Sequence, residues 1–535
     1  MIYNLKKGAA RCLLTFFFLT AVLSCGRSSP GTASNTFRVN LGTEPPSLDW
    51  SLATDHVSFN VIANIMVGLT EFDNKLKPAP VVATSWDILD SGRRILFHLR
   101  NDVLWTDGQK VKAQDFEYSW KRLLSPKTAS EYAYILFDIV NAEEFHQGKI
   151  AEESQVGVRA IDDVTLEVRL KHPVSYFTSI TTFEVTYPQR RDIVEKYGSR
   201  WTEPGNIVTN GPFRLTSWKH ENEIRLAANP DFFLGKPAME NVEMFMVNEK
   251  STALAMYEQG QLDFIDNHSV PILEKPRLSK LPEFKLVPQL RGYYYGFVID
   301  RKPFDDVRVR KAFALAVDRN LFPKILHGGE KPAGYWIPPG MPAHNPKIGL
   351  VYNPPEARRL LREAGYPDGR GFPQVTLAYN TDEDHKMVAE AVQGMWKRNL
   401  GVLVRLDNQE WKVYLNKLNT DPPHIFRLGW GADYPDPDNF MKLFTSLSGN
   451  NHTRWKNPRY DRVLDMAARE FNERKRKRLY DEAQKILCET DIPIVPLFTT
   501  AESTLLNQRF TGLEYSSMGR LLLRQVRAKS QVSGK

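Results

Sequence analysis

The chain has 535 residues, of which 42% are hydrophobic and 25% are charged, and its formal net charge is +8. This length is enough for two or three domains, each with its own hydrophobic core. Lys6, Lys7 and Arg11 account for part of the positive charge, and no clustered basic stripe follows them. The composition therefore argues against a nucleic-acid-binding protein, and we expect no nucleic acid among its partners.

The first residues carry the features of an export signal. Basic residues precede an apolar run from Leu13 to Leu23, which is shorter than the ~20 apolar residues that a membrane-spanning helix needs. The run leads to Cys25 in a context that resembles a bacterial lipobox, whose cysteine is lipidated. We predict a signal peptide over residues 1–24 and a lipid-anchored tether over 25–36, with an ordinary signal peptide cut elsewhere as the alternative. The body is then expected on the periplasmic side of the cell envelope, anchored to the membrane.

Cysteine usage excludes a disulfide between body cysteines. The chain has three cysteines: Cys12 lies in the leader, Cys25 is the predicted lipidation site, and Cys488 is left alone. Cys488 follows a helical pattern, so we expect a buried structural thiol.

In the first half of the chain, predicted strands surround one predicted helix. The helix covers residues 113–124, where Phe116, Trp120 and Leu123 recur at helical spacing. The predicted strands are residues 37–41, 95–100 and 165–170.

The second half contains a strand–helix–strand pattern. Residues 374–379 are a predicted strand, 383–400 a predicted helix that ends before Gly401, and 402–406 a second predicted strand. A βαβ unit of this kind implies a parallel pair with a right-handed crossover. The predicted fold class is therefore α/β.

Other helices are marked by their boundary residues. Asp306 is a predicted N-cap for a helix over residues 307–317, and Asn353 caps a helix that ends at Gly365. The basic run over residues 473–478 also lies in a helical pattern, and we expect a solvated helix face rather than a docking patch.

The stretch from Arg427 to Phe440 combines one carboxylate with aromatic residues and an accessible backbone. Asp433 lies between Trp430 and Tyr434, and glycines at positions 429 and 431 allow another molecule to approach the backbone closely. An extended run of this kind is able to hold another extended chain by its backbone and its ammonium group. The alternative is a plain acidic turn rich in proline.

Four blocks of the chain carry a family resemblance: Leu41–Asp49, Thr209–Phe233, Arg291–Phe297 and Pro303–Ala312. They resemble extracellular solute-binding proteins of the peptide- and nickel-binding family, and the resemblance covers nearly everything after the tether. It implies a two-lobed periplasmic-binding-protein fold (type II, cluster C-like), with an extra inserted domain and a hinge between the lobes. The ligand is expected between the lobes, which close by hinge motion.

The same resemblance supplies domain boundaries that local composition does not mark. They are residues 37–56 for the first part of lobe I, 57–180 for the inserted domain, 181–285 for the second part of lobe I, 286–498 for lobe II and 499–535 for the third part of lobe I.

The resemblance also implies roles for charged residues. Asp433 aligns with the carboxylate that binds the ligand's α-ammonium group. Arg427, His385 and Lys417 are candidates for the ligand carboxylate, and arginine suits this role because its planar fork holds a carboxylate through two hydrogen bonds. For His385, a surface or capping histidine is the open alternative.

Further candidates line or flank the expected groove. Glu44 matches an acid that contacts a ligand ammonium or a bound lysine, with a plain surface carboxylate as the alternative. Trp411 matches an aromatic wall of a side-chain pocket, Trp430 either does the same or packs in the core, and Tyr434 is a further candidate beside them. Tyr293 and Tyr295 are expected to pack in the core.

One position departs from some relatives, which carry a cysteine where this chain has Gly431, paired with another cysteine in the second lobe. That bridge is absent here, so packing alone must stabilise this region. A smaller residue at this position is also expected to widen the groove next to Asp433.

The resemblance implies a monomeric receptor of an ABC importer, which captures short oligopeptides and passes them to a membrane permease. No phosphate-binding loop, nucleophile elbow or zinc-protease motif occurs in the sequence, and we expect no catalysis, metal or cofactor. Alternatives within the fold are receptors for a dipeptide, a cell-wall peptide, a nickel chelate or haem. Alternatives from other classes are a chaperone and an anchored envelope hydrolase that uses Glu44 and Asp433 as paired carboxylates.

Overall fold

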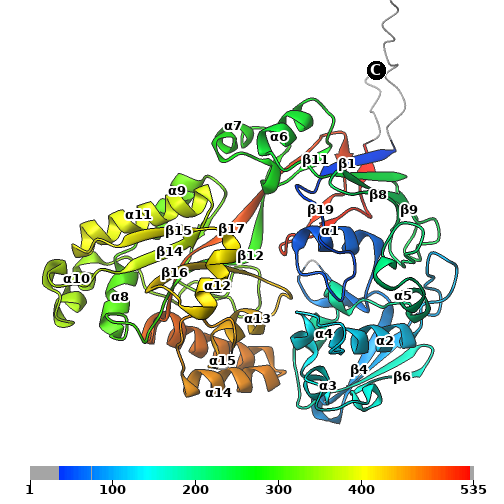
Figure 1. Cartoon of the computed structure of the whole chain (residues 1–535), viewed down its shortest axis with the longest axis horizontal. Helices are drawn as coiled ribbons and strands as arrows, with labels where there is room; N and C mark the ends of the chain where they lie inside the picture. Colours follow the sequence, from blue (N-terminus) through cyan, green and yellow to red (C-terminus); the bar gives the residue numbers. More distant parts are fainter. Residues whose placement is uncertain (1–34, 74, 447, 530–535) are drawn as a thin grey trace, which may run out of the picture. The chain divides into compact units, whose positions relative to one another are not determined.

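The computed structural model describes residues 35–73, 75–446 and 448–529, and it describes only the backbone of His268, Trp411 and Lys412 (Figure 1). The predicted signal peptide, the tether up to residue 34 and the predicted lipidation site Cys25 lie outside the described residues. Within the described part of the chain, no helix is both long and apolar enough to cross a membrane.

One end of a large mixed sheet is built from the N-terminal and middle parts of the chain. The predicted strand at residues 37–41 is confirmed as β1, whose Phe37 and Val39 are buried. β1 pairs in parallel with β10, and β10, β9 and β8 continue the sheet as antiparallel neighbours. The strands are β1 (Thr36–Asn40), β8 (Phe213–Lys219), β9 (Glu223–Ala228), β10 (Asn241–Phe245) and β11 (Phe264–Ile265).

Residues predicted as the inserted domain contain their own antiparallel sheet, in the order β4-β5-β7-β6. The predicted helix over residues 113–124 is confirmed as α2, and it buries Phe116 and Trp120. Two predicted strands are confirmed as β5 and β7, each within one residue of its expected bounds. The elements are β2 (Thr70–Phe72), β3 (Pro78–Pro80), β4 (Ala83–Leu89), β5 (Arg94–Leu99), α2 (Ala113–Leu124), α3 (Ala142–His146), β6 (Val158–Asp162), β7 (Thr165–Arg169) and α4 (Phe177–Ile180).

Two long antiparallel strands, β12 (Phe284–Phe297) and β17 (Ile494–Leu506), join the two ends of the large sheet. β17 pairs with β11 on the side of lobe I, while β12 pairs with β16 (Ile425–Gly431) on the side of lobe II. Figure 1 shows both strands running between these neighbours. The ladder between them shifts register between Pro288 and Gly292. β12 and β17 therefore occupy the place of the expected hinge strands.

Lobe II contains the predicted βαβ unit. β14 (Thr376–Asn380) and β15 (Arg405–Gln409) pair in parallel, and α11 (Glu383–Leu400) connects them and ends at Gly401 in a left-handed conformation. β15 begins at residue 405 rather than 402, because Val402 and Val404 are buried in the core before pairing with β14 starts.

The predicted helix caps are confirmed. The Asp306 side chain accepts a hydrogen bond from the N–H of Arg308, and the Asn353 side chain accepts one from Glu356. The remaining α-helices with five or more described residues are α1 (His56–Ile65), α5 (Arg191–Tyr197), α6 (Lys250–Glu258), α8 (Val307–Leu315), α9 (Phe322–Leu326), α10 (Pro354–Glu363), α12 (Trp411–Thr420), α13 (Pro437–Met441), α14 (Pro458–Arg469) and α15 (Glu473–Lys485), which continues as a π-helical turn over Ile486–Thr490.

The segment after β16 is not extended throughout. The strand stops at Gly431, and a short helix, α13, begins at Pro437. Asp436 caps this helix by accepting a hydrogen bond from the N–H of Asp438, and a proline suits the first turn. The proline-rich turn predicted as the alternative thus follows the strand rather than replacing it.

The basic run in α15 is only partly solvated. Arg476 turns inward and makes two hydrogen bonds to the Asp436 carboxylate, at 2.7 and 2.6 Å. The two side chains are 13% and 8% exposed.

Cys488 follows this helix; it is buried as predicted, and burial raises the pKa of its thiol.

We expect Arg476→Met to lower the free energy of unfolding by about 3–5 kcal/mol, because it leaves the buried Asp436 carboxylate without its cation. Arg474→Met is the matched control, since Arg474 lies on the same helix but is exposed. Chemical denaturation of both variants measures the effect. Equal stabilities for the two variants would contradict the structural role of this ion pair.

Candidate functional site

Along most of its length, β16 has a partner strand on only one of its two edges. On one side, β12 pairs with it from Ile425 to Gly431. On the other side, β14 pairs only with Ile425 and Phe426. Beyond Phe426, no strand in the described part of the chain covers this second edge.

The backbone groups on the open edge belong to alternate residues. The Tyr414 hydroxyl bridges Arg427, accepting from its N–H at 3.0 Å and donating to its carbonyl at 2.7 Å. At the other end, the N–H of Ala432 donates to Leu290 in β12, at 2.9 Å. Because backbone groups alternate in direction along a strand, Gly429 and Gly431 direct their N–H and C=O groups away from β12.

A cavity of about 560 Å³ lies along this edge. Gly429, Trp430, Gly431, Ala432 and Asp433 form one wall. The facing residues come from the N-terminal part of the chain, the predicted inserted domain and the C-terminal segment. They include Thr54, Asp55, His56, Phe59, Glu131, Tyr132, Tyr134 and Arg520.

Asp433 ends this wall and has no cationic partner. Its carboxylate accepts hydrogen bonds from the Tyr132 hydroxyl at 3.2 Å and from the Asn439 side chain at 3.1 Å. Burial raises the pKa of the Asp433 carboxyl, and these two hydrogen bonds oppose the shift. Among the side chains that the structure describes, no Lys, Arg or His nitrogen lies within 4.0 Å of it. The positive charge of Arg520, which lies beyond ion-pair distance and lines the same cavity, also lowers the pKa of Asp433.

Arg291 occupies the space beside Gly431, the position expected to widen the groove. The two residues are opposite each other in the ladder between β12 and β16. A Cβ atom added at Gly431 would lie 3.3 Å from Arg291 Nε. The guanidinium group also donates a long hydrogen bond, 3.4 Å, to Glu502. The space expected from the smaller residue is therefore taken up by arginine.

Two of the predicted aromatic residues have different roles. Trp430 lines the cavity and donates from its indole N–H to Asn439 Oδ1 at 2.9 Å. Tyr434 is buried, and its ring stacks on Tyr176 at a centroid distance of 5.7 Å. Tyr434 lines neither of the two cavities that we describe, so it packs between segments instead of facing the groove.

The structure brings Arg427 and His385 together around Tyr293. The Arg427 guanidinium lies over the Tyr293 ring, 4.4 Å from its centroid, and the His385 ring meets the same tyrosine edge-on at 5.6 Å. Arg427 Nε and His385 Nδ1 are buried and make no hydrogen bond to the described residues. Burial, together with the nearby Arg427 charge, lowers the pKa of His385 to about 3. Tyr293 and Tyr295 are buried in the core, as predicted.

Of the predicted site residues, Asp433 and Trp430 line the cavity, whereas Arg427, His385, Tyr434, Lys417 and Glu44 do not. Lys417 pairs with Asp407 at 2.8 Å. The Glu44 carboxylate is occupied by the Trp218 indole N–H, at 2.8 Å, and by a backbone N–H. Trp411 is the first residue of α12, and its side chain lies outside the described part of the structure.

Several lining residues were not predicted from the sequence. Tyr132 and Arg520 reach Asp433 and its surroundings from distant parts of the chain, and no local motif marks them. Asn439 does not line the cavity but holds two residues that do, Asp433 and Trp430. It belongs to the stretch from Arg427 to Phe440, and its bonds depend on the helical turn of α13. No group of three or more His, Cys, Asp or Glu side chains suited to a metal occurs among the described residues.

The depressed pKa of His385 predicts a pH effect on stability. The folded chain holds the neutral imidazole, so the unfolded chain protonates first as the pH falls through ~6.5, its ordinary value. The stability contribution is present above this pH and is lost as the pH falls toward about 3. We therefore expect that lowering the pH from 7 to 4.5 reduces the free energy of unfolding of His385→Gln by roughly 2 kcal/mol less than that of the wild type. Denaturant unfolding at both pH values measures this loss.

The more exposed His98 gives the control variant, His98→Gln. If His385→Gln and the wild type lose the same stability on acidification, the imidazole is not held neutral by its surroundings.

The family model for bacterial extracellular solute-binding proteins, family 5 Middle, matches residues 77–452. The oligopeptide-binding protein OppA of Bacillus subtilis is 34% identical over 97% of this chain and 99% of its own length. The periplasmic murein peptide-binding protein MppA of Escherichia coli is 35% identical over 88% of each chain. Haemophilus influenzae OppA, solved in complex with the peptide RPPGFSPFR, superposes with a TM-score of 0.76 at 32% identity, covering 93% of this chain and 99% of that one. The chain belongs to the bacterial extracellular solute-binding proteins of family 5.

Proposed function

We propose that this chain is the solute-binding receptor of an ABC importer, which captures short oligopeptides between its lobes and delivers them to a membrane permease. The observation that carries this proposal is the open edge of β16, which ends at a carboxylate without a cation. An extended peptide can add to such an edge as a further strand. Backbone pairing of this kind provides affinity that does not depend on the peptide's side chains.

The charges at the two ends of the edge give the peptide a direction. Its α-ammonium group lies at Asp433, and its carboxylate lies toward Arg427 and His385. From Arg427 to Gly431 the strand rises four steps of ~3.3 Å, or about 13 Å, which suits a peptide of about three to five extended residues. Arg427 has no carboxylate within ion-pair distance among the described residues; it lies over Tyr293 and donates to Asn380, and it is close in the sequence to the residues that line the cavity but is not among them.

Capture is coupled to closure of the lobes around β12 and β17, within the domain boundaries that the sequence predicts. We propose a monomer that is anchored through Cys25 on the periplasmic side of the envelope. Its role is binding and transfer, without a catalytic step. The hydrolase alternative needs Glu44 and Asp433 as a pair, but the Glu44 carboxylate binds Trp218 and does not line the cavity.

A cell-wall peptide is the second candidate ligand. The similarity to the murein peptide-binding protein of Escherichia coli favours it over a nickel chelate or haem. Such a ligand also has a free amino end and a peptide backbone, so the same strand edge and the same Asp433 would hold it.

We expect Asp433→Asn to weaken the binding of a free-amine tripeptide by roughly 10- to 150-fold, because a hydrogen bond to a charged group is worth about 1.5–3 kcal/mol. The N-acetylated form of the same tripeptide has no ammonium group, so its affinity should change little. Isothermal titration calorimetry of both ligands against both proteins measures the difference. Equal losses for the two ligands would remove Asp433 as the amine anchor.

Asp231→Asn supplies a matched control, because Asp231 is exposed and lies far from this site in the sequence. If the wild-type chain binds no free tripeptide to pentapeptide, the peptide proposal fails irrespective of the result at Asp433.

A further inference from the structure

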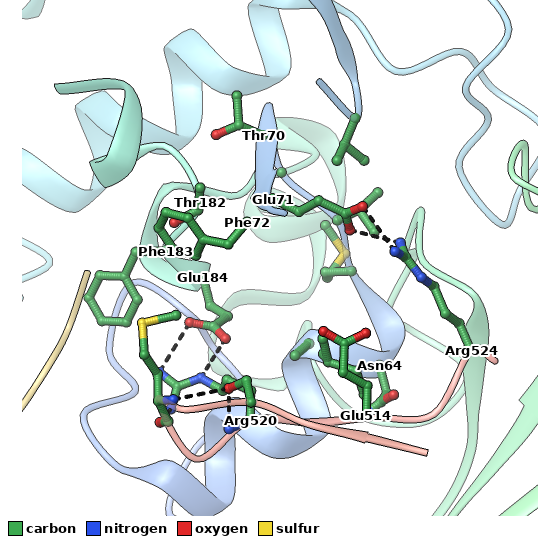
Figure 2. Close-up of a pocket in the computed structure, with 18 of the residues that line it drawn as sticks. Asn64, Thr70, Glu71, Phe72, Thr182, Phe183, Glu184, Glu514, Arg520 and Arg524 are labelled. Carbon is green, nitrogen blue, oxygen red and sulfur yellow. Dashed lines mark hydrogen bonds and ion pairs between the residues drawn. The ribbon is translucent and has the colours of Figure 1, made fainter. Parts of the chain in front are cut away.

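A second cavity, of about 330 Å³, shares a wall with the proposed peptide groove. Asp433 and Arg520 line both cavities, so their side chains belong to the partition between them. The remaining walls come from the end of α1 and the residues after it, from β2, from residues 182–187 and from the hairpin of β19 (Glu514–Tyr515) and β20 (Leu521–Leu522). Figure 2 shows this cavity with the residues around it.

Part of the lining is apolar. Met66, Val67, Phe72, Phe183, Leu522 and Leu523 contribute to it, from four separate segments of the chain. An apolar ligand body therefore finds complementary walls, and its transfer from water is favourable.

The charges of the lining are not balanced. Five carboxylates line the cavity, from Glu71, Asp73, Glu184, Asp433 and Glu514, against the two guanidinium groups of Arg520 and Arg524. The two arginines are already committed: Arg520 pairs with Glu184 at 2.6 Å and Arg524 pairs with Glu71 at 2.8 Å.

Three carboxylates remain after these two ion pairs. None of them has an ion pair among the described residues. Asp73 accepts hydrogen bonds from the backbone N–H groups of Lys75 and Lys77, and Asp433 is shared with the proposed peptide groove. The exposed Glu514 is therefore the carboxylate that is left to this cavity alone. In Figure 2, the Glu514 carboxylate lies between the two ion pairs, and no dashed line joins it to either arginine. A cavity with this charge attracts cations and disfavours anions.

We propose that this cavity is a second binding site, which accepts an organic cation with an apolar body. Its carboxylates hold an ammonium or guanidinium group, and its apolar walls cover the carbon skeleton. Two sources have this chemistry: a free amine, or the basic side chain of a peptide that lies in the neighbouring groove. The site itself stands on its own lining, and only the peptide source rests on the proposed function.

A pair of isosteric probes tests the site with a free ligand. We expect the full chain to bind phenethylammonium at least 10-fold more tightly than 2-phenylethanol, and Glu514→Gln to reduce this preference at least 5-fold. Glu390→Gln is the matched control, because Glu390 is an exposed glutamate on α11 in lobe II. Calorimetry of both probes against the wild type and these two variants measures the preference in each protein. Ser517→Phe should abolish phenethylammonium binding by filling the cavity, since Ser517 lines it.

A second pair of probes tests the peptide source. One tripeptide begins with lysine and the other with norleucine, which has an uncharged side chain of similar length. If the peptide is the source, Glu514→Gln weakens the lysine peptide at least 5-fold and leaves the norleucine peptide unchanged. The norleucine peptide also reports on the peptide groove alone, so loss of the second site and failure of the proposed function are distinguishable.

A selective loss with either charged probe supports the proposal and identifies its source. If Glu514→Gln changes neither charged probe, or changes them no more than Glu390→Gln does, the proposal is overturned. Binding of phenethylammonium that is unaffected by Ser517→Phe would also overturn it, because the amine would then lie elsewhere.

Discussion

The proposed peptide site depends on one strand, β16, which loses one of its two partner strands partway along its length. β14 leaves β16 after Phe426, while β12 stays paired with it up to Gly431. The Tyr414 hydroxyl satisfies the outward backbone groups of Arg427 where the partner strand stops. The next outward groups belong to two glycines that line a cavity. An exposed edge invites pairing with another chain, and here a cavity of limited size restricts that chain to a short peptide.

Asp433 links this edge to the opposite lobe. Its carboxylate binds the Tyr132 hydroxyl, and the neighbouring Tyr434 stacks on Tyr176, so two tyrosines of the predicted inserted domain meet consecutive residues of lobe II. Lys442 adds a 2.5 Å hydrogen bond to the Tyr176 hydroxyl. In the proposed function, a ligand ammonium group at Asp433 would add to this contact, and ligand binding would then favour the arrangement in which the contact is made.

Local patterns in the sequence predicted the helices well and the site only in part. α2 and α11 have their predicted bounds, because apolar spacing and cap residues lie within the helices themselves. The direction of Arg476 could not be predicted, because its partner Asp436 is 40 residues away. Tyr132 lies 301 residues from Asp433, and that contact exists only in the folded chain. Glu44 was placed at the groove by resemblance, whereas its carboxylate binds Trp218 within lobe I.

The identity of the ligand that co-purifies with the chain from its native host decides whether this protein is a peptide receptor. The protein is isolated without unfolding, the bound material is released by denaturation, and its masses and fragments are determined by mass spectrometry. The account predicts a mixture of short peptides with free amino ends, because the strand edge binds backbone and Asp433 binds the ammonium group. A single ligand without a peptide backbone, or peptides whose amino ends are all blocked, would contradict it.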